Sequence, residues 1–169
     1  ESNYIGALPQ SNGPGTEWAD FWRDERILPQ VERARDAGHF PGRESEELDT
    51  LLEALPGILE GAGDDGPSLL HGDLWSGNVY PGPAGEPVLI DPSVYRGHRE
   101  VDLAMSELFG GFPPSFYDAY HEAWPISPRY DAVRRDAYQL YYLLVHVNLF
   151  GFGYVGSSMS AVRRLLAAE

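Results

Sequence analysis

Apolar residues recur at helical spacing through the first third of the chain. Trp18, Phe21 and Trp22 fall on one face of a predicted helix, for which Thr16 is the expected N-cap, and Pro29 is expected to end or restart it. A leucine stripe at positions 48, 51, 52 and 55 predicts a further helix, interrupted at Pro56. Later helices are expected over residues 99–109, 114–124, 129–150 and 160–168.

The pattern changes in the middle of the chain. Ser68–Leu70 and Pro87–Ile90 are short apolar runs bounded by Gly and Pro, which indicates buried strands, and residues 81–85 between them are typical of a hairpin connection. The opening segment 3–15 is rich in turn-forming residues and is expected to be loop. The sequence therefore predicts a single domain over residues 1–169, α+β and mostly helical, with a small β-hairpin that carries loops.

Composition narrows the possible functions. The 169 residues include no Cys, and 26 acidic against 12 basic side chains give a net charge of −14, so disulfides and thiolate metal sites are excluded. This charge argues against nucleic acid and anionic membranes as partners. All 12 basic residues are Arg, which removes any lysine that would clamp a phosphate. Because no signal-like or membrane-spanning run is evident, we expect a soluble, cytoplasmic chain.

One loop carries the residues of phosphoryl-transfer chemistry. His71, Asp73 and Asn78 stand in the pattern H-x-D-x-x-x-x-N, the spacing of a kinase catalytic loop. Such a reaction needs a carboxylate that accepts the proton of the attacking hydroxyl and an amide oxygen that holds a divalent metal. Asp91, at the end of the next apolar run, is the expected second metal ligand. A solvated turn would explain the same residue types without chemistry, but the repeated strand and loop context favours the kinase interpretation.

The glycines after the long helix offer a false lead. Residues 151–156 match G-x-G-x-x-G, a nucleotide-binding pattern, but they follow a helix rather than a strand. We therefore interpret them as a helix C-terminus and turn.

The residues around the two loops resemble the fructosamine kinase family, within the wider aminoglycoside-phosphotransferase-like group. The resemblance rests on H-G-D-L-W-S-G-N at residues 71–78 and on I-D-P-S-V-Y-R-G-H-R-E-V-D-L-A-M at residues 90–105, and it extends over essentially the whole chain. It implies the C-terminal lobe of a protein-kinase-like fold, which uses ATP and Mg²⁺ to phosphorylate a sugar hydroxyl of a ketosamine, either small or protein-bound.

The same resemblance implies roles for individual residues. Asp73 becomes the catalytic base, Asn78 and Asp91 the metal ligands, and Asp102 a brace for the catalytic loop. His71 is expected to support the loop rather than transfer protons. Trp75 either stacks on the sugar or plugs the apolar surface beside the loop, and the sequence favours neither.

The chain departs from the family in lacking the N-terminal β lobe, with its strand lysine and phosphate-covering loop. We therefore expect the nucleotide-binding lobe to be absent from this chain and the chain alone to be inactive, because its negative charge opposes a triphosphate.

Other functions stay open at this point. A related small-molecule kinase, acting on aminoglycoside-like or choline-like substrates, would use the same loops. A metal-dependent phosphohydrolase would use His71, Asp73, Asp91 and His98 as ligands, which leaves Asn78 unexplained. A non-catalytic binding module would keep the substrate contacts without turnover.

Overall fold

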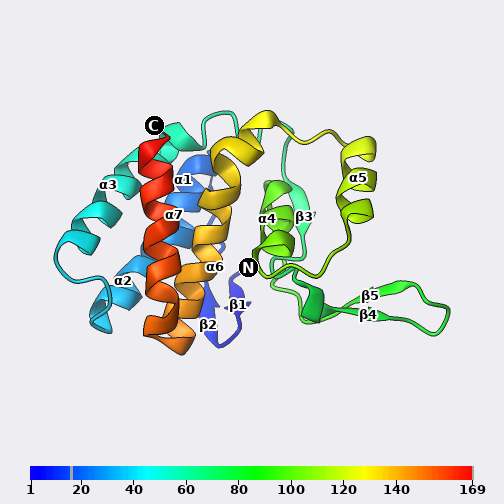
Figure 1. Ribbon diagram of the computed structural model, residues 1–169, viewed down its shortest axis with the longest axis horizontal. Coiled ribbons are helices and arrows are strands. Elements are labelled where there is room, and N and C mark those ends of the chain that lie inside the picture. Colours follow the sequence, from blue (N-terminus) through cyan, green and yellow to red (C-terminus); the bar gives the residue numbers. More distant parts are fainter. Residues whose placement is uncertain (16, 169) are drawn as a thin grey trace.

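The computed structural model describes residues 1–15 and 17–168, and its centre is one long helix, α6 (Arg135–Phe150). Helices α2 (Leu28–Asp36), α4 (Glu100–Leu108) and α7 (Val155–Ala167) pack against α6, as Figure 1 shows. The other helical elements are α1 (Trp18–Trp22), η1 (Arg23–Ile27), α3 (Arg43–Ile58), η2 (Ser76–Asn78), α5 (Pro114–Ala123), η3 (Tyr130–Arg134) and η4 (Phe152–Tyr154).

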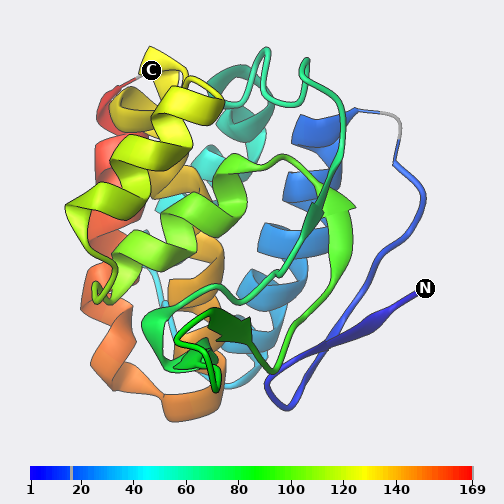
Figure 2. The same ribbon diagram turned by 90° about the vertical axis from the view of Figure 1, so that its right-hand side faces the viewer.

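The strands form three small antiparallel pairs. They are β1 (Asn3–Ile5) with β2 (Leu8–Gln10), β3 (Ser68–Leu70) with β6 (Tyr95–Gly97), and β4 (Val79–Pro81) with β5 (Pro87–Leu89). The β4–β5 hairpin extends away from the helices in Figure 1. Figure 2 shows the β1–β2 hairpin, in blue, beside the chain that leads into β6. The mostly helical α+β architecture predicted from the sequence is confirmed.

Apolar stripes explain why the helices pack as they do. Leu48, Leu51 and Leu55 of α3 are completely buried, and they face a core to which α6 contributes Tyr138 and Tyr141. Burial of each such leucine stabilises the fold by about 1.5–3 kcal/mol. The stripe thus fixes which face of α3 turns inward.

Two prolines do not break their helices, contrary to expectation. Pro29 lies at the start of α2, directly after the π-helical segment η1, and the change from π-helical to α-helical hydrogen bonding there accommodates a residue without an N–H. Pro56 lies in the last turn of α3, which ends only two residues later. The first helical stretch is therefore continuous from Trp18 to Asp36.

Three other predictions about local structure are wrong. The opening segment is not all loop, because Ile5 and Leu8 are buried on either side of a tight turn at Gly6, whose φ is +55°. The run 87–90 is not buried, since Val88 and Leu89 are 40% and 52% exposed. Helix α7 begins at Val155 rather than at residue 160. The predicted cap, Thr16, lies outside the described residues.

The glycine pattern at residues 151–156 is a helix end, as predicted. Gly151 is the C-cap of α6 with a φ of +81°, and the short helix η4 then leads into α7. Along the described ranges, no helix combines the length and apolar character that a membrane crossing requires.

Candidate active site

The loop 71–78 is fastened to α4 by one buried carboxylate. Both oxygens of Asp102, in the first turn of α4, accept backbone N–H bonds, from His71 at 2.7 Å and from Gly72 at 2.9 Å. Burial raises the pKa of Asp102, and these two hydrogen bonds oppose that rise. Asp102 therefore lies behind the loop and fixes its backbone.

Gly72 permits the loop to lie directly against the segment that follows Asp91. Its φ is +80°, and a Cβ at this position would collide with the carbonyl group of Ser93. The Ser93 N–H donates to His71 O at 2.8 Å, and the Tyr142 hydroxyl of α6 donates to Gly72 O at 2.9 Å. Any other residue at position 72 would push these two segments apart.

The His71 ring joins the loop to the end of the β4–β5 hairpin. Its Nε2 lies 2.9 Å from the carbonyl oxygen of Ile90, so Nε2 must carry the hydrogen, and Nδ1 then accepts the Asp73 N–H at 3.3 Å. With both ring nitrogens used in this way, His71 acts as a support between two loops.

Asp73 and Asn78 are in direct contact. The Asn78 Nδ2 donates to the Asp73 main-chain oxygen at 2.9 Å and to its Oδ2 at 3.3 Å. Burial raises the pKa of the Asp73 carboxyl and the nearby Asp91 charge adds to the rise, whereas the Asn78 hydrogen bond and the His71 and His146 rings lower it. The environment thus makes Asp73 a better proton acceptor than an exposed aspartate.

Asp91 comes next to this pair through backbone contacts. The Ile90 N–H donates to Asn78 O at 3.1 Å, so the residue before Asp91 is bonded to the residue that holds Asp73. Asp91 itself is exposed and has a φ of +50°, which is uncommon for a residue other than glycine. The structure therefore brings His71, Asp73, Asn78, Asp91 and Asp102 into one neighbourhood.

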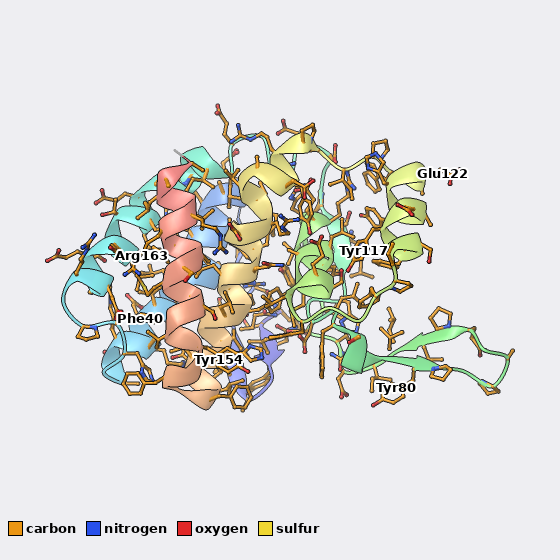
Figure 3. All side chains as sticks on the ribbon, viewed as in Figure 1. Phe40, Tyr80, Tyr117, Glu122, Tyr154 and Arg163 are labelled. Carbon is orange, nitrogen blue, oxygen red and sulfur yellow. The ribbon has the colours of Figure 1, made fainter. Side chains whose placement is uncertain are left out.

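A cavity of about 450 Å³ opens beside Asp73. Its wall is mainly apolar and includes the aromatic side chain of Trp75, which is 39% exposed and lies edge-on to Phe109 with ring centroids 6.5 Å apart. The Trp75 ring also covers Gly77, where a Cβ would collide with it. Tyr154, labelled in Figure 3 near the junction of α6 and α7, lines the same cavity.

His146 is a cavity residue that sequence reasoning missed. Its Nδ1 lies 2.7 Å from the main-chain oxygen of Tyr142, one turn earlier in α6. The imidazole ring packs against Phe109 and Tyr154 in the cavity wall. In the sequence, a histidine among the apolar residues of a helix gives no sign that it borders a cavity. Phe150, the last residue of α6, also lines this cavity and is 67% exposed.

His98 does not join the other predicted ligands. It is 3% exposed, and its Nδ1 lies 2.7 Å from the Tyr138 hydroxyl. Among residues 1–15 and 17–168, no three His, Asp or Glu side chains are grouped to hold a metal ion. The ligand set of a phosphohydrolase is therefore not assembled.

His98 should instead make stability depend on pH. Burial, helped by the charges of Arg134 and Arg99, lowers its pKa to about 4, so the unfolded chain binds a proton first as the pH falls from about 6.5. We expect the free energy of unfolding to drop by about 3 kcal/mol between these pH values. Denaturant titrations at several pH values in this range should show that the free energy of unfolding depends less on pH in His98→Gln than in the unmodified protein. An equal pH dependence in the two proteins would contradict the role of His98.

Comparisons with known proteins relate the chain to one family. A model of the fructosamine kinase family matches residues 1–168. The chain is 44% identical over 167 residues to a probable ketoamine kinase of Synechocystis, covering 97% of this chain and 54% of that protein. It is 40% identical over 161 residues to the ketosamine-3-kinase of Mus musculus, covering 95% of this chain and 50% of that protein. The chain thus spans about half the length of these relatives.

A solved structure shares the fold. The crystal structure of a protein assigned as a fructosamine-3-kinase, from Thermobifida fusca, superposes with a TM-score of 0.90 at 39% identity, over 98% of this chain and 57% of that one. The match of the family model over nearly every residue and the identity to several of its members lead to one conclusion: the chain belongs to the fructosamine kinase family.

Proposed function

We propose that the chain is the catalytic, C-terminal lobe of a protein-kinase-like enzyme that transfers a phosphoryl group from ATP to a sugar hydroxyl of a ketosamine. The observation that supports this most directly is Asp73, part-buried at the edge of the cavity and bonded to Asn78 in a loop that Asp102 fixes. A hydroxyl group that enters the cavity would meet this carboxylate.

Asp73 is the proposed general base. It would orient the attacking hydroxyl and accept its proton, and the raised pKa favours that transfer. The Asn78 amide donates to the carboxylate and the His71 ring accepts the Asp73 N–H, so Asp73 is held in place. This matters because positioning supplies most of phosphoryl-transfer catalysis.

Asn78 and Asp91 fit a magnesium ion. The Asn78 Nδ2 is used on Asp73, which turns the amide oxygen to other partners, and the Asp91 carboxylate is exposed beside it. Mg²⁺ prefers oxygen ligands and usually takes one or two protein groups together with substrate phosphates. A bound metal would neutralise charge on the phosphates, and these two side chains are the ones that would hold it.

The cavity beside Asp73 is the proposed substrate site. The exposed face of Trp75 is placed to stack on the sugar, while its edge contact with Phe109 keeps the ring in position. The ketosamine assignment rests on the family, whose member in mouse is named a ketosamine-3-kinase.

The rest of the protein is the proposed partner of the projecting hairpin. Three apolar side chains on β3 and the hairpin are exposed: Leu69 at 70%, Tyr80 at 54% and Leu89 at 52%. Figure 3 shows Tyr80 on the hairpin that projects from the rest of the fold. Because relatives are about twice as long, we propose that a nucleotide-binding lobe covers these apolar side chains. The same lobe would supply the phosphate-binding lysine that this chain lacks.

Replacement of Asp91 tests the proposal. In the intact protein, assayed with a ketosamine and ATP, Asp91→Ala should weaken binding of Mg²⁺ with nucleotide at least about 10-fold, because a metal ligand is lost. Calorimetry in the presence and absence of Mg²⁺ measures this effect, and the exposed Asp36→Asn serves as control. Unchanged metal dependence in Asp91→Ala would remove Asp91 from the site.

A further inference from the structure

The segment after Asp91 is held by a buried hydrogen-bond network that the proposed mechanism does not use. Ser93 is 3% exposed and lies two residues beyond Asp91. Its hydroxyl donates to the Tyr4 main-chain oxygen at 2.6 Å and accepts from Gln10 Nε2 at 2.8 Å. The β1–β2 hairpin is therefore hydrogen-bonded to the chain just after Asp91, the proposed metal ligand.

Gln10 is the centre of this network. It is 2% exposed, and its Nε2 also donates to Asn3 Oδ1 at 2.8 Å. Its Oε1 accepts the hydroxyl hydrogen of Tyr141, from α6, at 2.7 Å. The amide of Gln10 thus links the central helix α6 to Ser93, and both its Nε2 and its Oε1 are hydrogen-bonded.

Asp91 needs such support because of its own backbone. A φ of +50° is uncommon for a residue other than glycine, and a conformation of this kind persists where the surrounding structure fixes it. Before Asp91, the Ile90 N–H is bonded to Asn78 O. After it, Pro92 leads to Ser93, whose N–H is bonded to His71 O and whose hydroxyl is held by the network.

We propose that Gln10 is a positioning residue for Asp91: through the Ser93 hydroxyl it holds the Asp91 carboxylate where it binds the metal. The inference rests on the proposed function, in which Asp91 is a metal ligand. Gln10 is not proposed to contact the metal or the substrate. It acts by holding Ser93, so that the backbone of Asp91 and Pro92 is fixed between Ile90 and Ser93.

The test is direct binding of Mn²⁺, together with a non-hydrolysable ATP analogue, to variants of the intact protein. Ser93→Ala removes the hydroxyl but keeps the backbone bond to His71, and Gln10→Met removes the amide at similar volume. Ser93→Ala removes both bonds of the hydroxyl, the one to Tyr4 O and the one from Gln10 Nε2. We expect the Mn²⁺ dissociation constant to rise about fivefold in this variant, which corresponds to the net strength of a single neutral hydrogen bond, and by at least as much in Gln10→Met.

Two tyrosines of α6 provide a matched pair of controls. Tyr141→Phe removes the hydroxyl that holds Gln10, whereas Tyr138→Phe removes an equally buried hydroxyl that bonds to His98 and Trp18. Both should lower the melting temperature, but only Tyr141→Phe should raise the Mn²⁺ dissociation constant. Equal effects of the two tyrosine variants on Mn²⁺ binding, or unchanged binding in Ser93→Ala, would overturn the inference.

Asp91→Ala separates this inference from the proposed function. If Asp91→Ala leaves Mn²⁺ binding unchanged, Asp91 is not a ligand, and both fail. If Asp91→Ala weakens binding but Ser93→Ala and Gln10→Met do not, the proposed function stands and only the positioning role is lost.

Discussion

Replacement of Asp73 by Asn is expected to lower the turnover number of the intact protein about 100-fold or more, with nucleotide affinity nearly unchanged. The amide has the shape of the carboxylate but accepts no proton from the substrate hydroxyl. Steady-state kinetics with a ketosamine, together with nucleotide titration, measure the two quantities separately.

The two aspartate variants should differ in kind. Asp91→Ala is expected to weaken binding of metal and nucleotide, whereas Asp73→Asn is expected to act on the chemical step. A comparable loss of nucleotide affinity in both would mean that Asp73 is a metal ligand rather than the base.

Residues 1–169 alone are expected to show no measurable turnover. Phosphoryl transfer depends on groups that hold the triphosphate, and a chain of net charge −14 without Lys opposes its approach. Calorimetry with Mg²⁺ and ATP should detect no micromolar binding by these residues, and activity should appear when the proposed nucleotide-binding lobe is supplied. Micromolar binding and turnover by residues 1–169 would overturn the view that this lobe is incomplete.

The placement of the candidate site residues near one another was predictable from the sequence because they sit at fixed spacing in two loops. The spacing of Asp73 and Asn78 sets their contact, since only four residues separate them and the single turn η2 brings the amide back to the Asp73 oxygens. Asp102 was placed by the family resemblance alone, because nothing in the pattern of α4 distinguishes an acid that accepts loop N–H groups from one that faces solvent.

Other features depend on contacts between distant segments, which periodicity does not record. The β1–β2 hairpin has only three residues in each strand, and its stability comes from burial of Ile5 and Leu8 and from bonds to the chain near Ser93. His146 reads as part of an apolar helix, and only the fold shows that it borders the cavity. The exposure of β5 likewise reflects its place on a projecting hairpin rather than its composition.

The β4–β5 hairpin can change in length at its tip without moving the loops of the candidate site. Its base is closed by the bond from Ile90 to Asn78 and the strand pairing of Val79 with Leu89, so the loops on either side are fixed to one another below the tip. Residues 83–86 at the tip are exposed, and closing a longer loop there costs little additional entropy. The tip is therefore a place where relatives can gain or lose residues, and where a tag can be inserted, without displacement of Asp73 or Asp91.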